Sequence, residues 1–347
     1  MAGKSLTTLR TIAEKIGVST STVSRVLNGK SRQCRISPQT TRAVLEAARR
    51  LDFRPSHLAR SLRLCRTQTL GLLIPDISNP FFAQIARSVE TAARQRDYSM
   101  ILADTRESTE AEIAAVRLLS DRQVDGLIIL PVGQSGDHLR ILADEDLAVV
   151  IVDRDLPDLA LPCVTSDNFG GAYEAVGYLL DRGHRRIACL QGLPGTRPNE
   201  QRVHGWRKAM SDRGVTPDPQ LVRGDRYDTQ SGYEQTRILL DRTPDVTALF
   251  ALSNLIALGA IRALAERGRR IPQDVSLVCF DDQPWLAHMD PPITTVDQQN
   301  VRMGQIAVDM LLDRLAGRPL GDRRILLPTR FIERQSVRTL NRERVNA

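Results

Sequence analysis

A run of hydroxyl and guanidinium side chains near the N-terminus has the residue types and spacing for reading DNA. The apolar residues around it repeat at helical spacing, so the run falls on the exposed faces of a short helix. Hydroxyl and guanidinium groups hydrogen-bond to base edges and phosphates, and a helix with an apolar back and such a front suits the major groove. The run consists of Thr20, Ser21, Thr22, Ser24 and Arg25.

A second set of polar and aromatic residues lies mostly where predicted strands end in the rest of the chain. Ligands bind at the carboxyl ends of parallel strands, so these residues are candidates for a small-molecule site. A guanidinium fork such as that of Arg202 suits a pair of hydroxyls or a carboxylate. The candidates are Asn79, Phe81, Phe82, Asp153, Arg154, Arg202, Tyr227, Asn254, Asp281 and Gln298.

Each ligand-binding candidate has a purely structural alternative. Asn79 and Pro80 together could simply cap a helix, and Asp281 could bond only backbone amides. The adjacent carboxylates Asp281 and Asp282 are poor candidates for an acid–base pair, because neighbouring residues at a strand end point in different directions. We therefore interpret these side chains as binding or structural groups.

No catalytic or metal-binding pattern is found in the sequence. It has no GxSxG, P-loop or GxGxxG, and its 5 histidines are not paired with cysteines or carboxylates at metal or triad spacing. The 5 cysteines are scattered and odd in number, so we expect free thiols rather than disulfides or zinc ligands. We expect no enzymatic activity, no metal and no cofactor.

Three predicted helices position the DNA-reading run. The first has an apolar stripe of Ile12, Ala13 and Ile16, and Gly17 supplies the turn after it. Ser19 is a good N-cap for the second helix, and the Ser-Pro pair at 37–38 starts the third. The expected buried residues of the second and third helices are Val23, Val26 and Leu27, and Val44, Leu45, Ala48 and Leu51.

Positive charge is concentrated in this N-terminal segment. Residues 1–66 hold 14 Lys or Arg and 3 Asp or Glu, a net charge of +11, whereas the whole chain carries +7 and the remainder is therefore close to −4. A basic segment on a mildly acidic body is the electrostatic pattern of nucleic-acid binding. The alternative, a basic solvated three-helix cap without a DNA role, leaves this agreement of charge and helix pattern unexplained.

The sequence GVSTSTVSRVLNGK followed by RPSHLARSLR resembles the DNA-binding headpiece of the lactose-repressor (LacI/GalR) family of bacterial transcription regulators. The resemblance extends through most of the chain. It implies a homodimer that binds operator DNA, a double-stranded site, and responds to a small-molecule effector. The DNA contacts that it implies are Thr8, Ser19, Thr20, Ser21, Thr22, Ser24, Arg25, Asn28, His57, Ala59, Leu62 and Arg63.

The resemblance also assigns a hinge to the segment that begins at Pro55. Two turns of helix are marginal in isolation, so such a helix would form only when two subunits lie together on DNA. Leu62 matches the leucine that wedges into a minor-groove base step, at a cost of a few kcal/mol of unstacking. Without the resemblance, packing of Leu62 against the body would be the simpler interpretation.

Three departures from the family pattern stand out. Thr11 occupies a position that is commonly Asp, which puts a local hydrogen bond in doubt. The segment 28–36 is about three residues longer than usual, and its extra Arg32 and Arg35 could contact phosphate or lie in solvent. Leu255 follows Asn254 where the family usually has Asp, so either the ligand is less polar at that wall or the site is altered.

From residue 69 the pattern changes to apolar runs of strand length that alternate with helical stretches, which is typical of parallel α/β architecture. The expected strands are Leu70–Ile74, Ser99–Ala103, Gly126–Leu130, Val149–Val152, Ile187–Gln191, Ala248–Ala251 and Val275–Phe280. The expected helices are Phe82–Asp97, Thr109–Arg122, Asp137–Asp144, Phe169–Arg182, Asn199–Arg213, Ser231–Asp241, Leu255–Arg267 and Val301–Ala316. Two such series in succession predict two lobes with a cleft between them.

The expected fold is an all-α helix-turn-helix headpiece with a hinge helix, followed by a two-lobed α/β body that resembles a type I periplasmic binding protein. The predicted boundaries are 1–54 for the headpiece, 55–67 for the hinge, 68–165 with 298–328 for the first lobe, 166–297 with 329–340 for the second, and 341–347 for a disordered tail. No apolar run is long enough to span a bilayer and the N-terminus lacks a signal peptide, so we expect a cytoplasmic protein without a membrane partner.

The resemblance extends to the ligand cleft, where Arg202, Asn254 and Asp281 match effector contacts of the family. Tyr227 is a candidate aromatic wall on a loop one residue longer than usual, and Gln298 lies where the chain returns to the first lobe. The expected effector is a sugar or a sugar acid, the acid being suggested by Arg154 and Arg202. The alternatives are an extracytoplasmic solute-binding protein and an α/β sugar-processing enzyme with a fused DNA-binding domain.

Overall fold

The computed structural model describes residues 8–53, 66–132, 135–140, 147–156, 158–319 and 323–340. The chain divides into two compact units, Met1–Thr67 and Gln68–Ala347. The predicted DNA contacts His57, Ala59, Leu62 and Arg63, the hinge around them and the predicted tail 341–347 lie outside the described residues.

The N-terminal unit contains helices α1 (Leu9–Ile16), α2 (Thr20–Leu27) and α3 (Pro38–Arg50). Ile12, Val23 and Val44, one from each helix, are completely buried at the centre of its small core. The expected burial of Leu45 is wrong, because this side chain is 41% exposed. One residue along a helix turns the side chain by about 100°, so Leu45 faces away from the side on which Val44 and Ala48 pack.

Hydrogen bonds at the helix ends fix the turn between α1 and α2. Gly17 has a φ of 71°, the left-handed conformation that ends α1, and the Ser19 hydroxyl accepts from the Thr22 N–H at 3.1 Å to begin α2. At the start of α1, the Thr11 N–H donates to the Thr8 hydroxyl at 3.2 Å and the Thr8 N–H donates to Thr11 Oγ1 at 3.4 Å. Thr11 therefore completes a reciprocal capping box, and the local bond that its presence put in doubt is made.

The lengthened segment between α2 and α3 folds into a turn. The Cys34 N–H donates to the Lys30 carbonyl at 3.0 Å and the Ile36 N–H donates to the Ser31 carbonyl at 2.9 Å, while Ile36 packs against the headpiece core. Arg32 and Arg35 are both exposed. The added residues thus form an ordered turn with its basic side chains in solvent.

Two six-stranded sheets form the body, the unit of residues 68–347. All pairs of the first sheet are parallel, and in the second sheet only the β10–β12 pair is antiparallel. The first sheet has the order β11 (Arg324–Leu327), β5 (Cys163–Ser166), β4 (Ala148–Val152), β3 (Gly126–Ile129), β1 (Thr69–Ile74) and β2 (Ser99–Asp104). The second has the order β12 (Arg330–Ile332), β10 (Thr294–Asp297), β9 (Ser276–Phe280), β8 (Ala248–Ala251), β6 (Ile187–Leu190) and β7 (Val222–Arg223).

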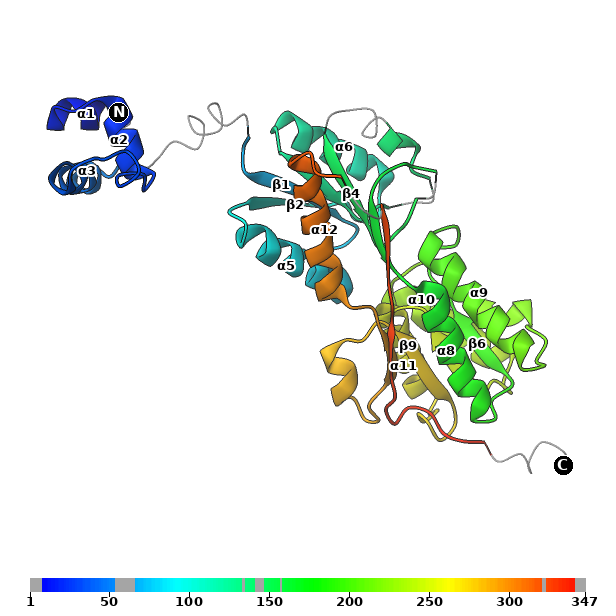
Figure 1. The fold of residues 1–347 in the computed structure, drawn as a ribbon. Coiled ribbons are helices and arrows are strands. Elements are labelled where there is room, and N and C mark those ends of the chain that lie inside the picture. The colour runs from blue at the N-terminus through cyan, green and yellow to red at the C-terminus, as the bar shows by residue number, and fades with distance from the viewer. Residues whose placement is uncertain are drawn as a thin grey trace, which may run out of the picture. The chain divides into compact units, whose positions relative to one another are not determined.

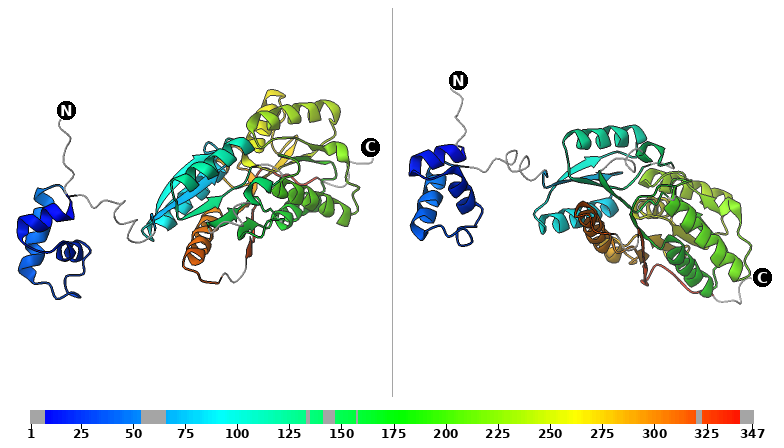
Figure 2. Two further views of the ribbon diagram at one scale, coloured as in Figure 1. Left: turned by 90° about the horizontal axis from the view of Figure 1, so that it is seen from above. Right: turned by 45° about the horizontal axis from the view of Figure 1, so that its top comes forward.

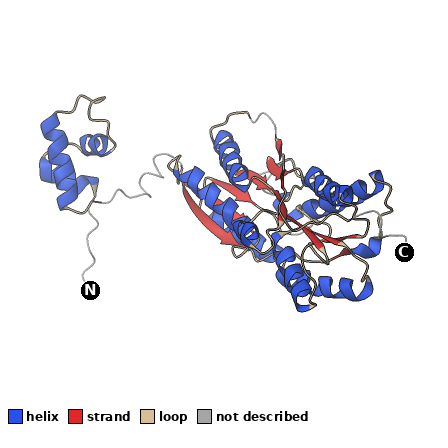
Figure 3. Cartoon of the chain, turned by 90° about the horizontal axis from the view of Figure 1, so that it is seen from below, coloured by secondary structure: helices blue, strands red, loops and turns tan. Residues whose placement is uncertain are grey.

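Helices cover these sheets (Figure 3). In the first lobe α5 and α12 pack side by side (Figure 1), and in the second lobe α8 packs on α9 and α10 on α11. The helices are α5 (Pro80–Arg94), α6 (Thr109–Asp121), α8 (Asn168–Asp181), α9 (Arg197–Asp212), α10 (Thr229–Arg242), α11 (Asn254–Glu266) and α12 (Asn300–Leu315), with 3-10 turns at Asp137–Leu139, Pro219–Leu221 and Pro284–His288. Of the expected helix Asp137–Asp144, the structure describes only that first short turn.

The expected fold class, a helix-turn-helix unit followed by a two-sheet α/β body, is confirmed. The sequence analysis did not identify the strands β5, β7, β10, β11 and β12. They have two to four residues and include polar sequences such as CVTS and TTVD, so they lack the apolar run by which a buried strand is found.

The chain passes between the two lobes of the body more than once. It crosses after β5, returns after β10, and crosses again between β11 and β12. Figure 2 shows the lobes from two further directions. Each lobe is therefore completed by C-terminal segments, and the crossings place polar residues such as Gln298 between the lobes.

Glycines bring α10 and α11 into backbone contact. A Cβ atom added at Gly259 would lie 2.1 Å from the Thr229 carbonyl oxygen and 2.5 Å from the Tyr233 nitrogen, and one at Gly232 would lie 2.4 Å from the Ile256 carbonyl oxygen. A backbone cannot withdraw as a flexible side chain can, so both positions require glycine.

We predict that Gly259→Ala lowers the free energy of unfolding of the body by about 1–3 kcal/mol, because the methyl group forces the two helices apart. Urea unfolding followed by circular dichroism measures the change. Gly177→Ala in α8 is the matched control, since the nearest atoms there belong to the end of the Arg213 side chain, which can shift where a backbone cannot. Equal stabilities of the two variants would contradict the close helix contact.

Candidate functional site

The candidate DNA-binding face lies on α2. Thr20, Ser21 and Arg25 are exposed, and Thr22 and Ser24 are half-buried. Among the residues that the structure describes, Arg25 makes no ion pair. The helix therefore presents hydroxyls and an uncompensated guanidinium outward, while Val23 and Val26 face the core.

Three further predicted DNA contacts take part in helix capping. Thr8 is the exposed N-cap of α1 and Ser19 that of α2. Asn28 ends α2, and its side-chain N–H donates to the Ser24 carbonyl at 2.6 Å. These residues hold the ends of α1 and α2. Ser21 is exposed but shares a hydrogen bond with the Ser19 hydroxyl at 2.8 Å, while Thr20 and Arg25 are exposed without taking part in the caps.

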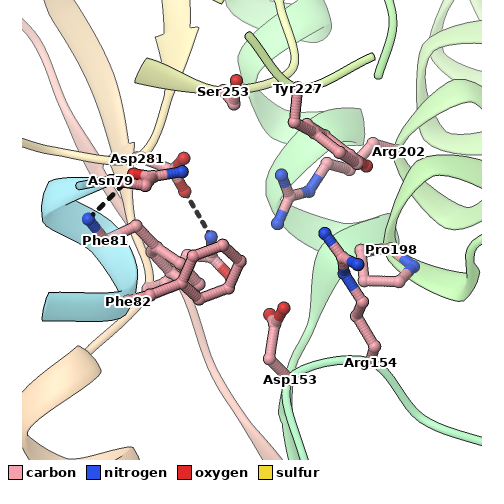
Figure 4. Close-up of a pocket in the computed structure, with 11 residues that line it drawn as sticks. Asn79, Phe81, Phe82, Asp153, Arg154, Pro198, Arg202, Tyr227, Ser253 and Asp281 are labelled. Carbon is pink, nitrogen blue, oxygen red and sulfur yellow. Dashed lines mark hydrogen bonds between the residues drawn. The ribbon is translucent and has the colours of Figure 1, made fainter. Parts of the chain in front are cut away.

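The structure brings nine of the ten ligand-binding candidates to one cavity between the lobes, together with Pro198 and Ser253 (Figure 4). Its free volume is about 30 Å³. Pockets for small ligands usually measure several hundred Å³, so the lobes are closed on one another in this structure. Asn254 is the one candidate that does not line the cavity.

The turns that follow strands hold two carboxylates in the cavity wall. Asp153 follows β4 with a φ of 66° and Asp281 follows β9 with a φ of 79°. Residues other than glycine rarely adopt this left-handed conformation, and it is concentrated at binding sites where the surrounding structure enforces it. Asn79 caps α5 by accepting from the Phe81 N–H at 3.0 Å and also lines the cavity, so the capping and lining roles coexist.

Arg202 is 97% buried and is held by neutral partners. Its Nε donates to Asn168 Oδ1 at 2.7 Å, its Nη1 donates to the Leu252 carbonyl at 2.6 Å, and its guanidinium lies 3.8 Å from the centroid of the Phe280 ring. Within the described residues Nη2 has no hydrogen-bond acceptor, so it is a donor available to a ligand.

Arg154 is already paired with a carboxylate. Its Nη1 and Nη2 each donate to an oxygen of Glu107 at 2.6 Å, which is the bidentate geometry of a strong ion pair. The charge of Arg154 is therefore neutralised within the protein, and this residue gives little support for an acidic effector.

The two carboxylates of the cavity wall differ in their partners. Asp281 accepts from the Gln298 side-chain N–H and from the Asn254 backbone N–H, whereas Asp153 Oδ1 has no donor among the described residues. Burial raises the pKa of Asp153 to about 6, although the neighbouring Arg202 and Arg154 oppose the shift. Burial also raises the pKa of Asp281.

Asp153 Oδ1 and Gln298 Oε1, two buried acceptors of the cavity wall, lack hydrogen-bond donors within the described part of the chain, and the buried Tyr227 hydroxyl of the same wall has no partner there either. Buried polar atoms are normally satisfied, and an unsatisfied one costs roughly 1–3 kcal/mol. Hydroxyl groups of a bound ligand would satisfy both acceptors.

Asn254 holds the lobes together instead of lining the cavity. Its Nδ2 donates to Asn79 Oδ1 in the first lobe at 3.3 Å, and its Oδ1 accepts from the Leu255 N–H at 2.7 Å. Both polar atoms of the Asn254 side-chain amide therefore have hydrogen-bond partners within the protein. Leu255, the departure from the family pattern, takes part through its backbone.

The sequence analysis missed three residues of this site. Ser253 follows β8 directly and caps α11 by accepting from the Ile256 N–H at 3.3 Å, so the rule used for the other strand ends could have found it. Pro198 stands at the start of α9, near Arg202. Glu107 has no sequence signal, because it is 47 residues from Arg154 in the chain.

A metal site and a membrane-spanning helix are both absent from the described residues. They contain no group of three or more His, Cys, Asp or Glu side chains placed to hold a metal ion. None of the helices in the described ranges is long and apolar enough to cross a membrane.

Comparison with known proteins gives matches to both units. The family model "Bacterial regulatory proteins, lacI family" matches residues 8–56, and "Periplasmic binding protein-like domain" matches residues 176–337. The HTH-type transcriptional regulator RegA of Clostridium saccharobutylicum is 35% identical over 336 residues, which cover 95% of this chain and 99% of the relative.

Two solved structures are similar over nearly the whole chain. The lac repressor dimer bound to operator and the anti-inducer ONPF matches with a TM-score of 0.85 and 27% identity, covering 96% of this chain and 100% of that chain. The complex of the transcriptional regulator CelR with cellobiose matches with a TM-score of 0.72 and 34% identity, covering 95% of this chain and 99% of that chain.

We predict that Asp153→Asn stabilises the ligand-free protein, and more so above pH 6 than at pH 4. The pKa of Asp153 in the folded state, about 6, exceeds its ordinary value of 3.8, so the folded protein binds the proton more tightly than the unfolded chain does. The contribution of this carboxyl to stability is therefore fully present below pH 3.8 and is lost as the pH rises to 6. Above pH 6 the loss reaches about 3 kcal/mol.

Urea unfolding of wild type and variant from pH 4 to pH 8 measures this difference. Asp121→Asn, at an exposed position near the end of α6, is the control and should leave the pH dependence unchanged. A pH-independent difference between wild type and Asp153→Asn would show that Asp153 does not titrate in this range.

Proposed function

Because the chain belongs to the lacI family of bacterial regulatory proteins and is a helix-turn-helix transcriptional regulator, we propose that it is a repressor that binds operator DNA as a homodimer. An uncharged sugar, bound between the two lobes of the body, controls this binding. A regulator of this kind acts in the cytoplasm, where the DNA is.

The observation that supports the sugar best is the pair of unsatisfied acceptors in the closed cavity. Asp153 Oδ1 and Gln298 Oε1 are buried without donors in the described part of the structure, and Arg202 Nη2 lies nearby as a free donor. A polyhydroxylated ring offers hydroxyls that both donate and accept. Phe82 and Tyr227 line the same cavity and offer aromatic faces to the apolar faces of such a ring.

The charges of the cavity favour an uncharged ligand over a sugar acid. Arg154 is neutralised by Glu107, and Arg202 is attracted by both Asp153 and Asp281. A carboxylate that entered would meet an unsatisfied carboxylate oxygen of Asp153. The bound sugar of the CelR relative agrees with this assignment.

The proposed regulation couples two sites in one chain. A ligand between the lobes adds contacts to Asp153 on one side and to Arg202 on the other, so it biases how closely the lobes approach. Segment 55–67 joins the body to the headpiece, and in the proposed dimer the lobe positions set the spacing of the two segments. The coupling is reciprocal, so operator binding changes the affinity for sugar by the same factor.

We predict that Arg202→Ala abolishes the effect of the sugar on operator binding, because the variant loses the free Nη2 donor and the guanidinium that attracts Asp153. Fluorescence anisotropy with DNA from the protein's own promoter region, with and without each sugar of a panel, measures the effect. Arg202→Lys keeps the charge but not the planar fork, so it should respond only weakly.

Arg207→Ala provides the matched control, since Arg207 is exposed on the same helix α9. It should respond like wild type. A normal sugar response of a folded Arg202→Ala would show that the ligand binds elsewhere.

We predict that operator affinity falls steeply with salt, with a log–log slope of several units, about 0.9 for each phosphate contacted. Arg25→Gln, on the exposed face of α2, should weaken binding and reduce the slope by about 1 if it contacts phosphate, or relax base preference if it contacts a base edge. Arg94→Gln, in the body, should change neither. A salt-independent affinity of the wild type would contradict the DNA-binding role of the basic headpiece.

A further inference from the structure

Arg154, which lines the cavity, forms an ion pair with Glu107, which lies behind it outside the lining. Arg154 is 96% buried, and both of its terminal nitrogens donate to the two oxygens of Glu107, whose side chain is 36% exposed. Arg154 Nη1 also lies 3.3 Å from the Pro131 carbonyl oxygen. Glu107 thus reaches a buried cation from the rim of the cleft.

Aromatic rings on both lobes hold the guanidinium in place. The Cζ atom of Arg154 lies 5.8 Å from the centroid of the Phe82 ring and 5.7 Å from that of Tyr227. Phe82 belongs to the first lobe and Tyr227 to the second. Figure 4 shows the guanidinium groups of Arg154 and Arg202 directed into the same cavity.

The backbone fixes Glu107 opposite Arg154. Glu107 lies in the loop between β2 and α6 with a φ of 54°, and its N–H donates to the Pro75 carbonyl at 2.9 Å. Pro75 directly follows β1, so the loop is tied to the end of the central strands. The carboxylate is therefore part of the built site and not a free surface group.

The charges around the cavity are three carboxylates against two guanidinium groups. Glu107 compensates Arg154 directly, Asp281 attracts Arg202, and Asp153 attracts both guanidinium groups. No cation of the cavity wall is left for an anionic ligand. If Glu107 were neutral, Arg154 would lose the carboxylate to which both of its terminal nitrogens donate, and Asp153 would be its remaining nearby counter-charge. Its terminal nitrogens would then be donors for an anionic group of the ligand.

We propose that Glu107 determines the charge specificity of the cleft: by neutralising Arg154 it selects uncharged hydroxylated ligands and rejects the corresponding acids. This inference rests on the proposed function, since it assumes that the cavity is the effector site. Glu107→Gln keeps the size and one acceptor of the side chain but removes its charge, so it should admit carboxylates.

The test compares matched sugar pairs on the full-length protein by titration calorimetry. Glucose with glucuronate, galactose with galacturonate, and cellobiose with cellobionate differ within each pair mainly in one carboxylate. Wild type should bind the neutral member of at least one pair at least tenfold more tightly than its acid. Glu107→Gln should bind the acid more tightly than wild type does, so the ratio of the affinity for the neutral sugar to the affinity for its acid should fall at least tenfold.

Two further variants separate charge from structure. Glu110→Gln, an exposed carboxylate at the start of α6 that bonds Ser108, should keep the wild-type ratio. The double variant Glu107→Gln/Arg154→Gln should lose the gained affinity for acids. A wild-type preference for the acid, or an unchanged ratio in Glu107→Gln, overturns the proposal.

If none of the sugar pairs binds, the proposed sugar effector itself is contradicted. The role of Glu107 can then still be tested by a measurement that does not use sugars. Sulfate is then the probe. At matched ionic strength, replacing chloride by sulfate should raise the Tm of Glu107→Gln by more than it raises the Tm of wild type or of the double variant. Sulfate stabilises all three by its exclusion from protein surfaces, and a bound anion adds to this effect in Glu107→Gln alone. No additional rise in Glu107→Gln overturns the proposal.

Discussion

The buried guanidinium of Arg202 is the interaction on which the cleft depends. A cation removed from water needs partners on every side, and here these come from α8 through Asn168, from the end of β8 through the Leu252 carbonyl, and from β9 through Phe280. The same charge opposes the effect of burial on Asp153 and Asp281. One side chain thus orders the wall of the second lobe and attracts two acidic groups of the cavity wall.

Hydrogen bonds between polar side chains join the two lobes in this closed arrangement. Asn254 bonds Asn79, and Gln84 donates to Gln283 at 2.9 Å, each pair joining one lobe to the other. Such hydrogen bonds exchange readily with water or ligand hydroxyls, and each contributes only about 0.5–1.5 kcal/mol to keeping the lobes together. A ligand with different affinities for the open and closed states can therefore shift the balance, which is all that allosteric control requires.

The sequence predicted what local chemistry determines and missed what distant segments decide. Gly17, Ser19 and the Ser37-Pro38 pair determine helix ends by themselves. The strand-end rule and the family resemblance together located nine cavity residues. Leu45 could not be placed, because helical spacing alone does not say how wide the buried face is. The pairing of Arg154 with Glu107 and the inter-lobe role of Asn254 depend on contacts between remote parts of the chain, which no periodicity records.

The repeated crossing of the chain between the lobes has a consequence for synthesis. Strands β11 and β12 pair with β5 and β10, and both follow all the other strands of the two sheets in the chain. Until they have been synthesised, β5 and β10 expose unpaired edges that can associate with other chains. A truncation that removed the chain from residue 324 onwards would therefore take an edge strand from both lobes at once.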